Sequence, residues 1–416
     1  MIEYEIENLY TKKTVMKNAF WLYFGFALNK LLKILIIILS ARILGPENYG
    51  TFTYVLSFLG LFFLISDWGI SSLLIRDYQQ TKEREKIINT SFTIKSLLIS
   101  ICIILSILGY FILNNENAKN VYFILLIMQV LIAFREFLNA LFKAIQKMEY
   151  ESIAISLESF VILIIVLTLL VKIPSVFNLG IAYFLGALVS LFFVLFAAHK
   201  FNFIKKLRFS FNKENLKYYF KNGTPLMLYG FLGFIFFSTD HLIIGYFRGM
   251  YELGLYSIAT KVILNLNLIP TIAMIALLPY LSFQVFNKEK LYKIYKKIFL
   301  AIILISFLVV ILINIFIDPL VRILLGSKYL LSIPIIKFLI WIIIFLFPLV
   351  LLDNIIFIFN RQWLNFYLTV GAALLNLLLN IILVPIYGIN GAIFATLISQ
   401  FLNFSISYYI VEKIIF

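Results

Sequence analysis

Cysteine and histidine are nearly absent from this chain of 416 residues, which contains one cysteine, Cys102, and two histidines, His199 and His241. A single cysteine excludes an intrachain disulfide, and the lack of a Cys or His cluster argues against a zinc site. The chain also lacks the GxxxxGK[ST] loop that binds nucleotide phosphates. We therefore expect no metal, no cofactor and no ATP-driven step within the chain.

Charged residues are also scarce, at 13% of the chain, whereas 63% of the residues are hydrophobic and the mean hydropathy is +1.02. This composition is typical of a membrane protein. A spanning helix needs about 20 mainly apolar residues. The sequence predicts an all-α integral membrane protein with twelve spans, at residues 19–41, 49–74, 91–113, 121–143, 153–171, 179–198, 223–247, 253–286, 298–317, 334–357, 363–384 and 391–411.

Lysine and arginine are distributed unequally between the two sides of these spans. Of the 35 basic residues, 23 lie on the side of the N-terminus, six on the other side and six within spans. Because such an excess marks cytoplasmic loops, we predict a multi-pass protein of the inner (cytoplasmic) membrane with both termini in the cytoplasm. The net charge of +15 has the same source, so we expect no nucleic-acid partner. The first eighteen residues lack the apolar stretch of a signal peptide, so we expect the first span to be retained.

Two pairs of segments indicate an internal duplication. GPENYGTFTY, residues 45–54, matches GMYELGLYSI, residues 249–258, at an offset of 204 residues. PSVFNLGIAYFLGALVS from Pro174 matches PIYGINGAIFATLISQ from Pro385 at an offset of 211. Two offsets this close favour one duplication event. The glycines of the first pair are predicted to form the external hairpin turn of each repeat: Gly45, Gly50, Gly249 and Gly254.

Six spans per repeat return the chain to its starting side, so both halves should have the same orientation. We therefore expect two six-helix lobes related by a pseudo-twofold axis along the membrane normal. The expected organisation is a cytoplasmic tail at 1–18, an N-terminal lobe at 19–198, a basic cytoplasmic linker at 199–222 and a C-terminal lobe at 223–416.

In ARILGPENYGTFTYVLSF, in LISDWGISSLLIRD and in DHLIIGYFRGMYELGLYSIATKV from Asp240, the chain resembles the polysaccharide flippases of the multidrug/oligosaccharidyl-lipid/polysaccharide exporter superfamily. The resemblance implies translocation of a lipid-linked (polyprenyl-diphosphate) oligosaccharide by alternating access, for cell-surface polysaccharides such as O-antigen. It also implies a lipid-linked glycan, membrane lipids and polysaccharide assembly proteins as partners. None of these motifs is catalytic, and the short connections leave little room for the domains of a polymerase or transferase, so we expect no enzyme.

Ionisable side chains inside the predicted spans are candidate functional residues, because each costs about 2.5 to 3.5 kcal/mol at the bilayer centre. One interpretation is a cationic cavity that binds the diphosphate. Its residues would be Lys30, Arg135, Lys261 and Lys95, of which Lys30 and Arg135 lie deepest in their spans. Their charge partners, or ion-coupling groups, would be Asp67, Asp240, Glu158 and Asp353. The other interpretation is structural ion pairs, for example Arg135 with Asp67 and Lys261 with Asp240.

Two further features leave alternatives open. Polar side chains within the spans would bond either sugar hydroxyls or neighbouring helices: Asn29, Gln129, Asn139, Asn376, Asn380 and Gln400. The alternative function is a cation-coupled exporter of small molecules, with H⁺ or Na⁺ bound at Asp67, Glu158, Asp240 or Asp353; the interior basic residues argue against it. The eighth span contains Pro270 and Pro279 and is predicted to protrude from the membrane, to kink, or both.

Overall fold

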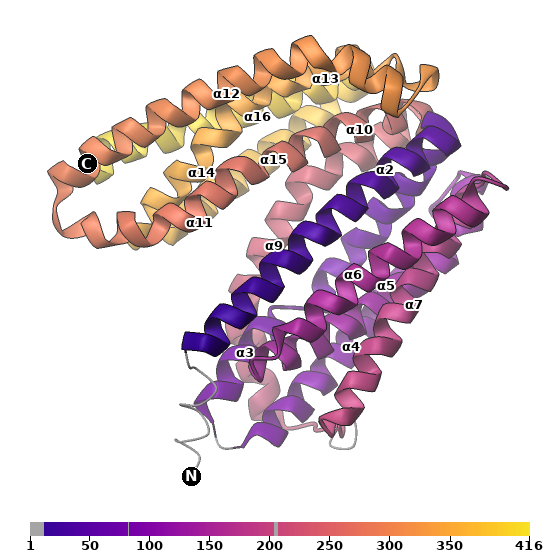
Figure 1. The fold of residues 1–416 in the computed structure, drawn as a ribbon, viewed down its shortest axis with the longest axis vertical. Helices are drawn as coiled ribbons and strands as arrows, with labels where there is room; N and C mark the ends of the chain where they lie inside the picture. The colour runs from indigo at the N-terminus through magenta and orange to yellow at the C-terminus, as the bar shows by residue number, and fades with distance from the viewer. Residues whose placement is uncertain (1–11, 82, 204–206) are drawn as a thin grey trace. The chain divides into compact units, whose positions relative to one another are not determined.

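The computed structural model describes residues 12–81, 83–203 and 207–416 (Figure 1). Within these ranges, the side chains of residues 12–15, 19, 22, 229, 230, 232, 233, 235–237, 276 and 279 are not described. The described residues form helices joined by short turns and contain no strand. Their contacts divide the chain into two compact units: the first contains residues up to 44 and residues 55–231, and the second contains residues 45–54 and 232–416. The lobe boundaries expected from the sequence stay a prediction.

The first unit contains most of the N-terminal half of the chain. Its elements are α2 (Lys12–Phe63, of which 45–54 lie in the second unit), η1 (Leu64–Ser66), α3 (Ile70–Gln80), α4 (Arg84–Tyr110), α5 (Glu116–Ala144), α6 (Met148–Ile165), η2 (Val166–Leu170), α7 (Val176–Lys200) and the start of α9 (Lys213–Phe247). Helix α7 packs against α5 and α6, and α3 packs against α4 and α5. Buried Leu74, Phe137, Phe142, Ala154 and Val194 belong to the core between them.

The second unit contains the rest of the chain. Its elements are the end of α9, α10 (Met250–Leu266), α11 (Leu268–Phe283), η3 (Gln284–Phe286), α12 (Lys288–Leu324), η4 (Ser327–Tyr329), α13 (Ser332–Leu339), η5 (Ile340–Ile342), α14 (Ile343–Ile358), α15 (Gln362–Tyr387), α16 (Ile389–Ile410) and η6 (Val411–Ile415). Helices α15 and α16 pack side by side, and α14 contacts α11, α12 and α16.

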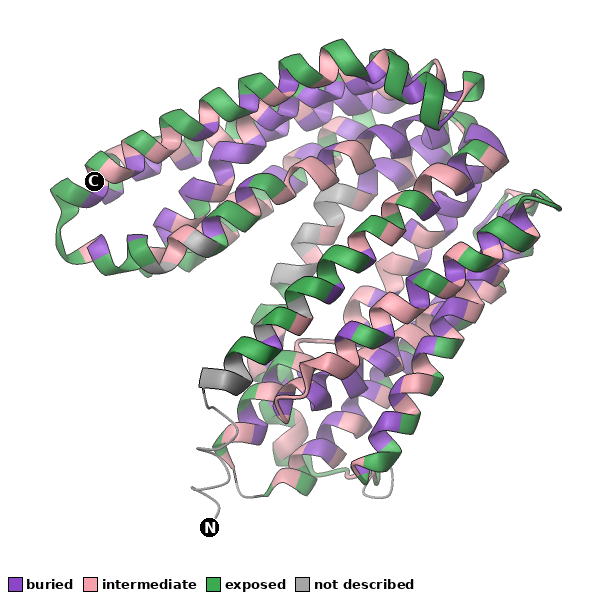
Figure 2. Cartoon of the chain, in the orientation of Figure 1, coloured by how far each residue is buried: buried purple, intermediate pink, exposed green. Residues whose placement is uncertain are grey.

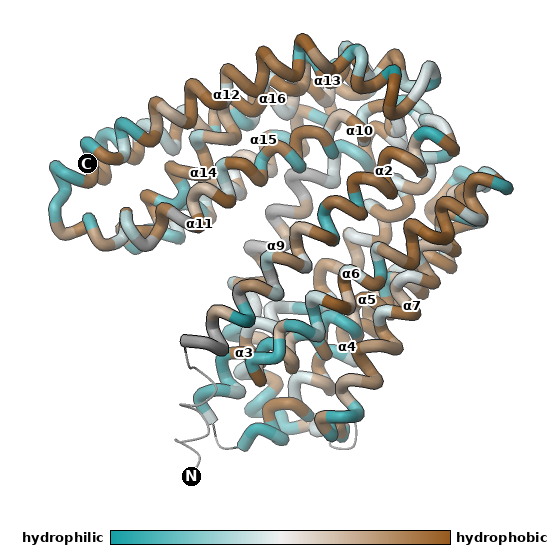
Figure 3. Tube along the Cα trace, in the orientation of Figure 1, coloured by the Kyte–Doolittle hydropathy of each residue, from teal (hydrophilic) through white to brown (hydrophobic). Residues whose placement is uncertain are grey.

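The helices carry apolar side chains on their outer faces as well as in the core. On α12, Leu304, Leu308, Ile311 and Ile315 are all more than half exposed and recur at intervals of three and four residues. That spacing places them on one face of the helix. Exposed and buried residues accordingly alternate along the long helices (Figure 2), and hydrophobic residues prevail along most of their length (Figure 3). An apolar outer face suits contact with lipid rather than with water.

Ten helical segments in the described residues are long and apolar enough to cross a membrane. One of them, Met16–Gln80, contains two of the twelve predicted spans, and a non-helical residue, Gly45, lies inside it. The predicted span at 223–247 lies in α9, whose side chains are described only in part. The predicted all-α membrane fold is confirmed.

The two predicted hairpin turns share their backbone conformation. Gly45 has φ 77° and ψ 173°, and Gly249 has φ 88° and ψ 175°. Within the second unit the turns also pack reciprocally. A Cβ on Gly50 would overlap the carbonyl oxygen of Met250, and a Cβ on Gly254 would overlap the carbonyl oxygen of Pro46. Since Met250 follows Pro46, and Gly254 follows Gly50, by 204 residues, this reciprocity supports the duplication.

Two predicted spans are interrupted. The second, predicted as one helix over 49–74, is broken: α2 ends at Phe63, and Trp68 and Gly69 have φ of 42° and 72° before α3 begins at Ile70. The eighth is interrupted at Asn267, between α10 and α11. This interruption lies beside Pro270, whose ring clashes with the carbonyl four residues earlier, at Leu266.

Candidate functional site

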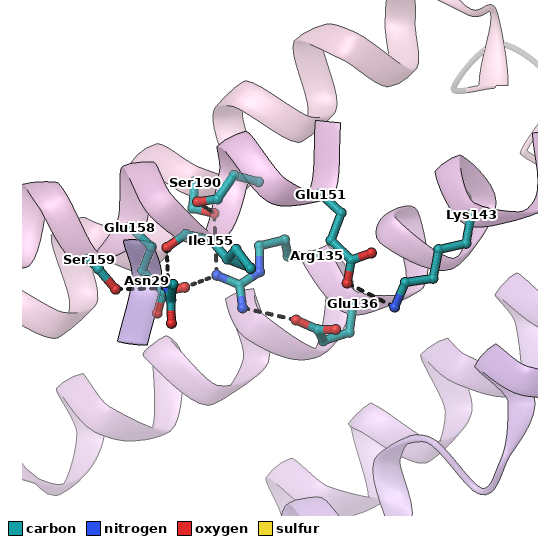
Figure 4. A network of polar contacts seen from close by, with 10 residues as sticks. Asn29, Arg135, Glu136, Lys143, Glu151, Ile155, Glu158, Ser159 and Ser190 are labelled. Atoms are coloured by element: carbon teal, nitrogen blue, oxygen red, sulfur yellow. Dashed lines mark hydrogen bonds and ion pairs between the residues drawn. The ribbon is translucent and has the colours of Figure 1, made fainter. Parts of the chain in front are cut away.

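Arg135 lies at the centre of a buried polar network in the first unit (Figure 4). Its guanidinium on α5 forms an ion pair with Glu158 on α6, donates to Ser190 Oγ on α7 at 3.2 Å, and contacts Glu136 Oε1 at 2.9 Å. Arg135 is 5% exposed and Glu158 6% exposed. A charge buried to this degree is tolerated only with a partner, so the network ties three helices together.

Helix α2 joins this network beside Glu158. Asn29 donates to the carbonyl oxygen of Ile155 at 2.7 Å and to Ser159 Oγ at 3.0 Å. Of the two interpretations of Asn29, the one realised here is helix-to-helix bonding. The example pair Arg135 with Asp67 is wrong. Arg135 points toward α6 and α7, whereas the next residue on α5, Glu136, lines the cavity that contains Asp67.

Asp67 lies at the break between α2 and α3. Its carboxylate accepts bonds from Lys95 Nζ at 3.0 Å and from Ser71 Oγ. Lys95, a predicted phosphate ligand, is therefore already paired with Asp67, and it is only 1% exposed. The break borders a cavity of about 320 Å³, lined by Phe63, Ser66, Asp67, Ser71, Lys95, Gln129, Ile132, Ala133 and Glu136. Non-helical backbone at membrane depth is tolerated where it is buried or lines such a cavity.

Asp240 on α9 is the centre of a second polar cluster, in the second unit. Its carboxylate accepts from Tyr256 at 2.6 Å, from Asn380 at 2.8 Å and from Thr396 at 3.0 Å. Asn376 extends the cluster, because it accepts from the Asn380 amide at 3.1 Å. A cavity of about 20 Å³ borders Asp240, which is room for about one water molecule.

Lys261 does not pair with Asp240, so the second example pair is also wrong. Its ammonium bonds to the hydroxyl of Tyr49 and lies 4.3 Å from the centroid of that ring. Lys261 follows Tyr256 by five residues on α10, and 3.6 residues per turn put the two side chains on different faces. Tyr49 belongs to the first hairpin turn, so this contact adds to the packing between that turn and α10 within the second unit.

The remaining predicted site residues have fewer contacts. Lys30 on α2 is partly exposed and has no acceptor among the described residues. The carboxylate of Asp353 on α14 is exposed and likewise has no partner in the part of the chain that the structure describes. The predicted cations are therefore distributed over both units: Lys30, Lys95 and Arg135 lie in the first and Lys261 in the second. That these four cations form one substrate site stays a prediction.

Several residues of these networks were not predicted. Tyr256 and Thr396 bind Asp240, Ser190 binds Arg135, and Tyr49 binds Lys261. Hydroxyl side chains are common in apolar helices, so composition does not mark them as partners. Tyr256 lies opposite Phe52 in the duplicated turn segments, and this matched aromatic position is the signal that would have selected it. Tyr49 lies opposite Leu253, so the duplication does not mark it. No group of three or more His, Cys, Asp or Glu side chains suited to a metal occurs among the described residues.

Comparison with known proteins gives a family match. The model of the family described as "Polysaccharide biosynthesis protein" matches residues 15–284, more than half of the chain. The chain belongs to this family. A protein of Shigella flexneri named "Putative O-antigen transporter" is 24% identical over 295 residues, which cover 65% of this chain and 67% of that protein.

Two solved structures share the fold. "Lipid II flippase MurJ, inward closed conformation" has a TM-score of 0.77 at 15% identity and covers 94% of this chain and 88% of its own. "Inward-facing conformation of a multidrug resistance MATE family transporter of the MOP superfamily" has a TM-score of 0.73 at 16% identity, with coverage of 92% and 94%. The family member described here thus has the fold of transport proteins of that superfamily, as the resemblance in the sequence implied.

Proposed function

We propose that this protein is a flippase that moves a lipid-linked oligosaccharide from the cytoplasmic to the outer leaflet by alternating access. The observation that carries the proposal is the match to the polysaccharide biosynthesis family over residues 15–284. The names of the Shigella flexneri relative and of MurJ point to the same class of cargo. The proposed location is the inner membrane, with both termini in the cytoplasm, and the proposed partners include other proteins of polysaccharide assembly.

The diphosphate of the cargo would be bound by cationic side chains. Lys30 is the strongest candidate, because it has no acceptor among the described residues and its ammonium is free to take a phosphate oxygen. Arg135, Lys95 and Lys261 would have to exchange Glu158, Asp67 or Tyr49 for the cargo. In this proposal those three residues bind phosphate only after the bonds to their present partners have broken.

Coupling to H⁺ or Na⁺ is the proposed energy source, and Asp240 is the proposed coupling group. Its buried carboxylate is bonded to three neutral groups, of Tyr256, Asn380 and Thr396, and borders a cavity of about 20 Å³. A buried carboxylate is costly without a counter-charge, and a proton or a small cation would supply it. Asp240→Asn should make transport independent of the ion gradient, whereas Asp353→Asn, at an exposed carboxylate, should leave the dependence intact.

Reconstitution tests the main proposal. The purified protein is placed in liposomes with a fluorescent polyprenyl-diphosphate oligosaccharide, and loss of fluorescence to a membrane-impermeant quencher reports transfer between leaflets. We expect transfer to exceed that of protein-free liposomes and of a fluorescent phospholipid. The alternative, a cation-coupled exporter of small molecules, is favoured by the similarity to the MATE transporter. Export of cationic dyes without movement of the glycan lipid would replace the proposal by that alternative.

A further inference from the structure

We propose that the cavity at the break between α2 and α3 binds a sugar residue of the cargo's headgroup rather than its diphosphate. This cavity, named the Asp67 cavity, has the nine lining residues given above and lies within the first unit. The inference rests on the proposed function and adds to it a subsite with its own chemistry: an uncharged pyranose ring held by carboxylate, amide and hydroxyl groups.

The Asp67 cavity has unused hydrogen-bonding capacity. Lys95 and Ser71 both bond to Oδ1 of Asp67, so no described residue occupies Oδ2. Arg135 bonds to Oε1 of Glu136, which leaves Oε2 of that carboxylate free of described partners. Gln129 also has no partner among the described residues, and Ser66, at 6% exposure, has none there either. Two acceptors, an amide and a hydroxyl thus converge on one space.

The charge of the cavity disfavours phosphate. Among its lining residues, Asp67 and Glu136 are acidic and Lys95 is basic, which leaves one net negative charge. Behind Glu136, Arg135 is balanced by Glu158, so the surrounding network does not alter this sum. While Lys95 stays paired with Asp67, a diphosphate would be repelled, whereas sugar hydroxyls donate to carboxylates and suit acceptors that are already held in place.

The size and the lining of the cavity favour a sugar over a metal ion or a proton. Its volume of about 320 Å³ equals that of about ten water molecules, more than one cation with its ligands needs. Phe63, Ile132 and Ala133 provide an apolar wall beside the polar groups. A pyranose ring has the same two-sided character, with C–H groups on its faces and hydroxyls at its edge, and small-molecule sites usually combine apolar walls with a few polar groups.

The helix break explains why the site is formed at this position. Trp68 Nε1 donates to Thr224 Oγ1 at 3.1 Å, and Trp68 packs with Phe220. These contacts with α9 hold the non-helical residues in place. Cys102 Sγ donates to the carbonyl oxygen of Phe62 at 3.2 Å, near the end of α2. With the break fixed on both sides, the Asp67 carboxylate is held at the cavity rather than along the face of a continuous helix.

Binding measurements on the full-length protein in nanodiscs test the inference. The probes are polyprenyl diphosphate and the same lipid carrying one hexose, one N-acetylhexosamine or one hexuronic acid. For the wild type we expect a neutral sugar to raise the affinity above that of the sugar-free lipid. Gln129→Leu should reduce the affinity for the neutral glycolipid about two- to tenfold, the loss of one or two hydrogen bonds. Its affinity for polyprenyl diphosphate should stay unchanged. Gln362→Leu, the same change at an exposed position on α15, is the matched control.

A second variant gives a result that misfolding would not produce. Asp67→Asn should weaken binding of the neutral glycolipid about tenfold and strengthen binding of the hexuronic acid lipid, because it removes the net negative charge and leaves Lys95 available. Equal losses for the sugar-free lipid would show that the cavity holds the diphosphate. A change in Na⁺ dependence with unchanged sugar affinity would show a cation site. Either result overturns the inference but leaves the proposed function standing. If the wild type binds none of the lipids, both fail.

Discussion

Arg135 is held by two carboxylates inside the first unit, and its loss would leave one of them buried without a counter-charge. Breaking a buried ion pair by removing one partner costs about 3 to 5 kcal/mol. We predict that Arg135→Gln lowers the amount of folded protein in the membrane and that adding Glu158→Gln restores it. Membrane abundance and thermal unfolding in detergent measure both effects. Arg248→Gln is the control, because its partner Glu252 is partly exposed, and such pairs contribute about 0 to 1 kcal/mol. Normal abundance of Arg135→Gln would contradict a structural role.

Lys30 differs from Arg135 because no described residue depends on its charge. Replacing it should therefore affect cargo rather than stability. We predict that Lys30→Gln removes a charge-assisted contact worth about 1.5 to 3 kcal/mol, which lowers affinity for the glycan lipid about 10- to 150-fold at normal abundance. Lys33→Gln, at an exposed lysine on the same helix, should have little effect. Normal glycan export by Lys30→Gln would remove Lys30 from the binding site.

At the scale of helices, the reciprocal contact of the two hairpin turns depends on two glycines without side chains. Gly50 and Gly254 each approach a carbonyl oxygen of the other turn. We predict that Gly50→Ala and Gly254→Ala destabilise the protein by about 1 to 3 kcal/mol, the usual effect of overpacking. Gly371→Ala on α15, where nothing lies within 4 Å of the added Cβ, should instead stabilise by about 0.5 to 1 kcal/mol. The melting temperature should fall for Gly50→Ala and Gly254→Ala and rise for Gly371→Ala. Equal shifts for all three would refute the close contact.

The break at Asp67 shows where sequence reasoning about helices is incomplete. Apolar length predicts that residues 49–74 span the membrane, but length alone does not show whether the helix is continuous. The signal was present as Ser66 to Gly69, SDWG, in which a turn-forming acid and a glycine interrupt the apolar run. By contrast, the interruption at Asn267 follows from a single covalent constraint, the ring of Pro270, and was predictable as a kink.

For the whole molecule, the sequence predicted the fold class and the repeat better than the pairing of its charges. Hydropathy is a property of long segments and survives errors of a few residues, and the duplication is visible as two similar offsets. Charge pairing depends on which face each residue occupies. Arg135 and Glu136 are neighbours in sequence, yet one reaches Glu158 and the other lines the Asp67 cavity. A sequence without helix contacts cannot separate those directions.

The orientation of the whole chain in the membrane is a prediction from the bias of lysine and arginine, and labelling tests it. We predict that a cysteine at Asn117, an exposed position at the start of α5, reacts with a membrane-impermeant maleimide from outside the cell. A cysteine at Lys290, exposed at the start of α12, should react only after the membrane is opened, because the basic segments are predicted to face the cytoplasm. Lys205 is predicted on the cytoplasmic side too, and lies outside the described residues.

The labelling is done in a Cys102→Ala background, so that the introduced cysteine is the one thiol of the chain. Cys102 itself is buried, and its thiol bonds to the carbonyl oxygen of Phe62. In the predicted topology three spans lie between Asn117 and the linker, and two more lie between the linker and Lys290. The total of five is odd, so the two labels should appear on opposite sides of the membrane. Labelling of Asn117 and Lys290 from the same side would therefore contradict the twelve-span topology, whatever the cargo proves to be.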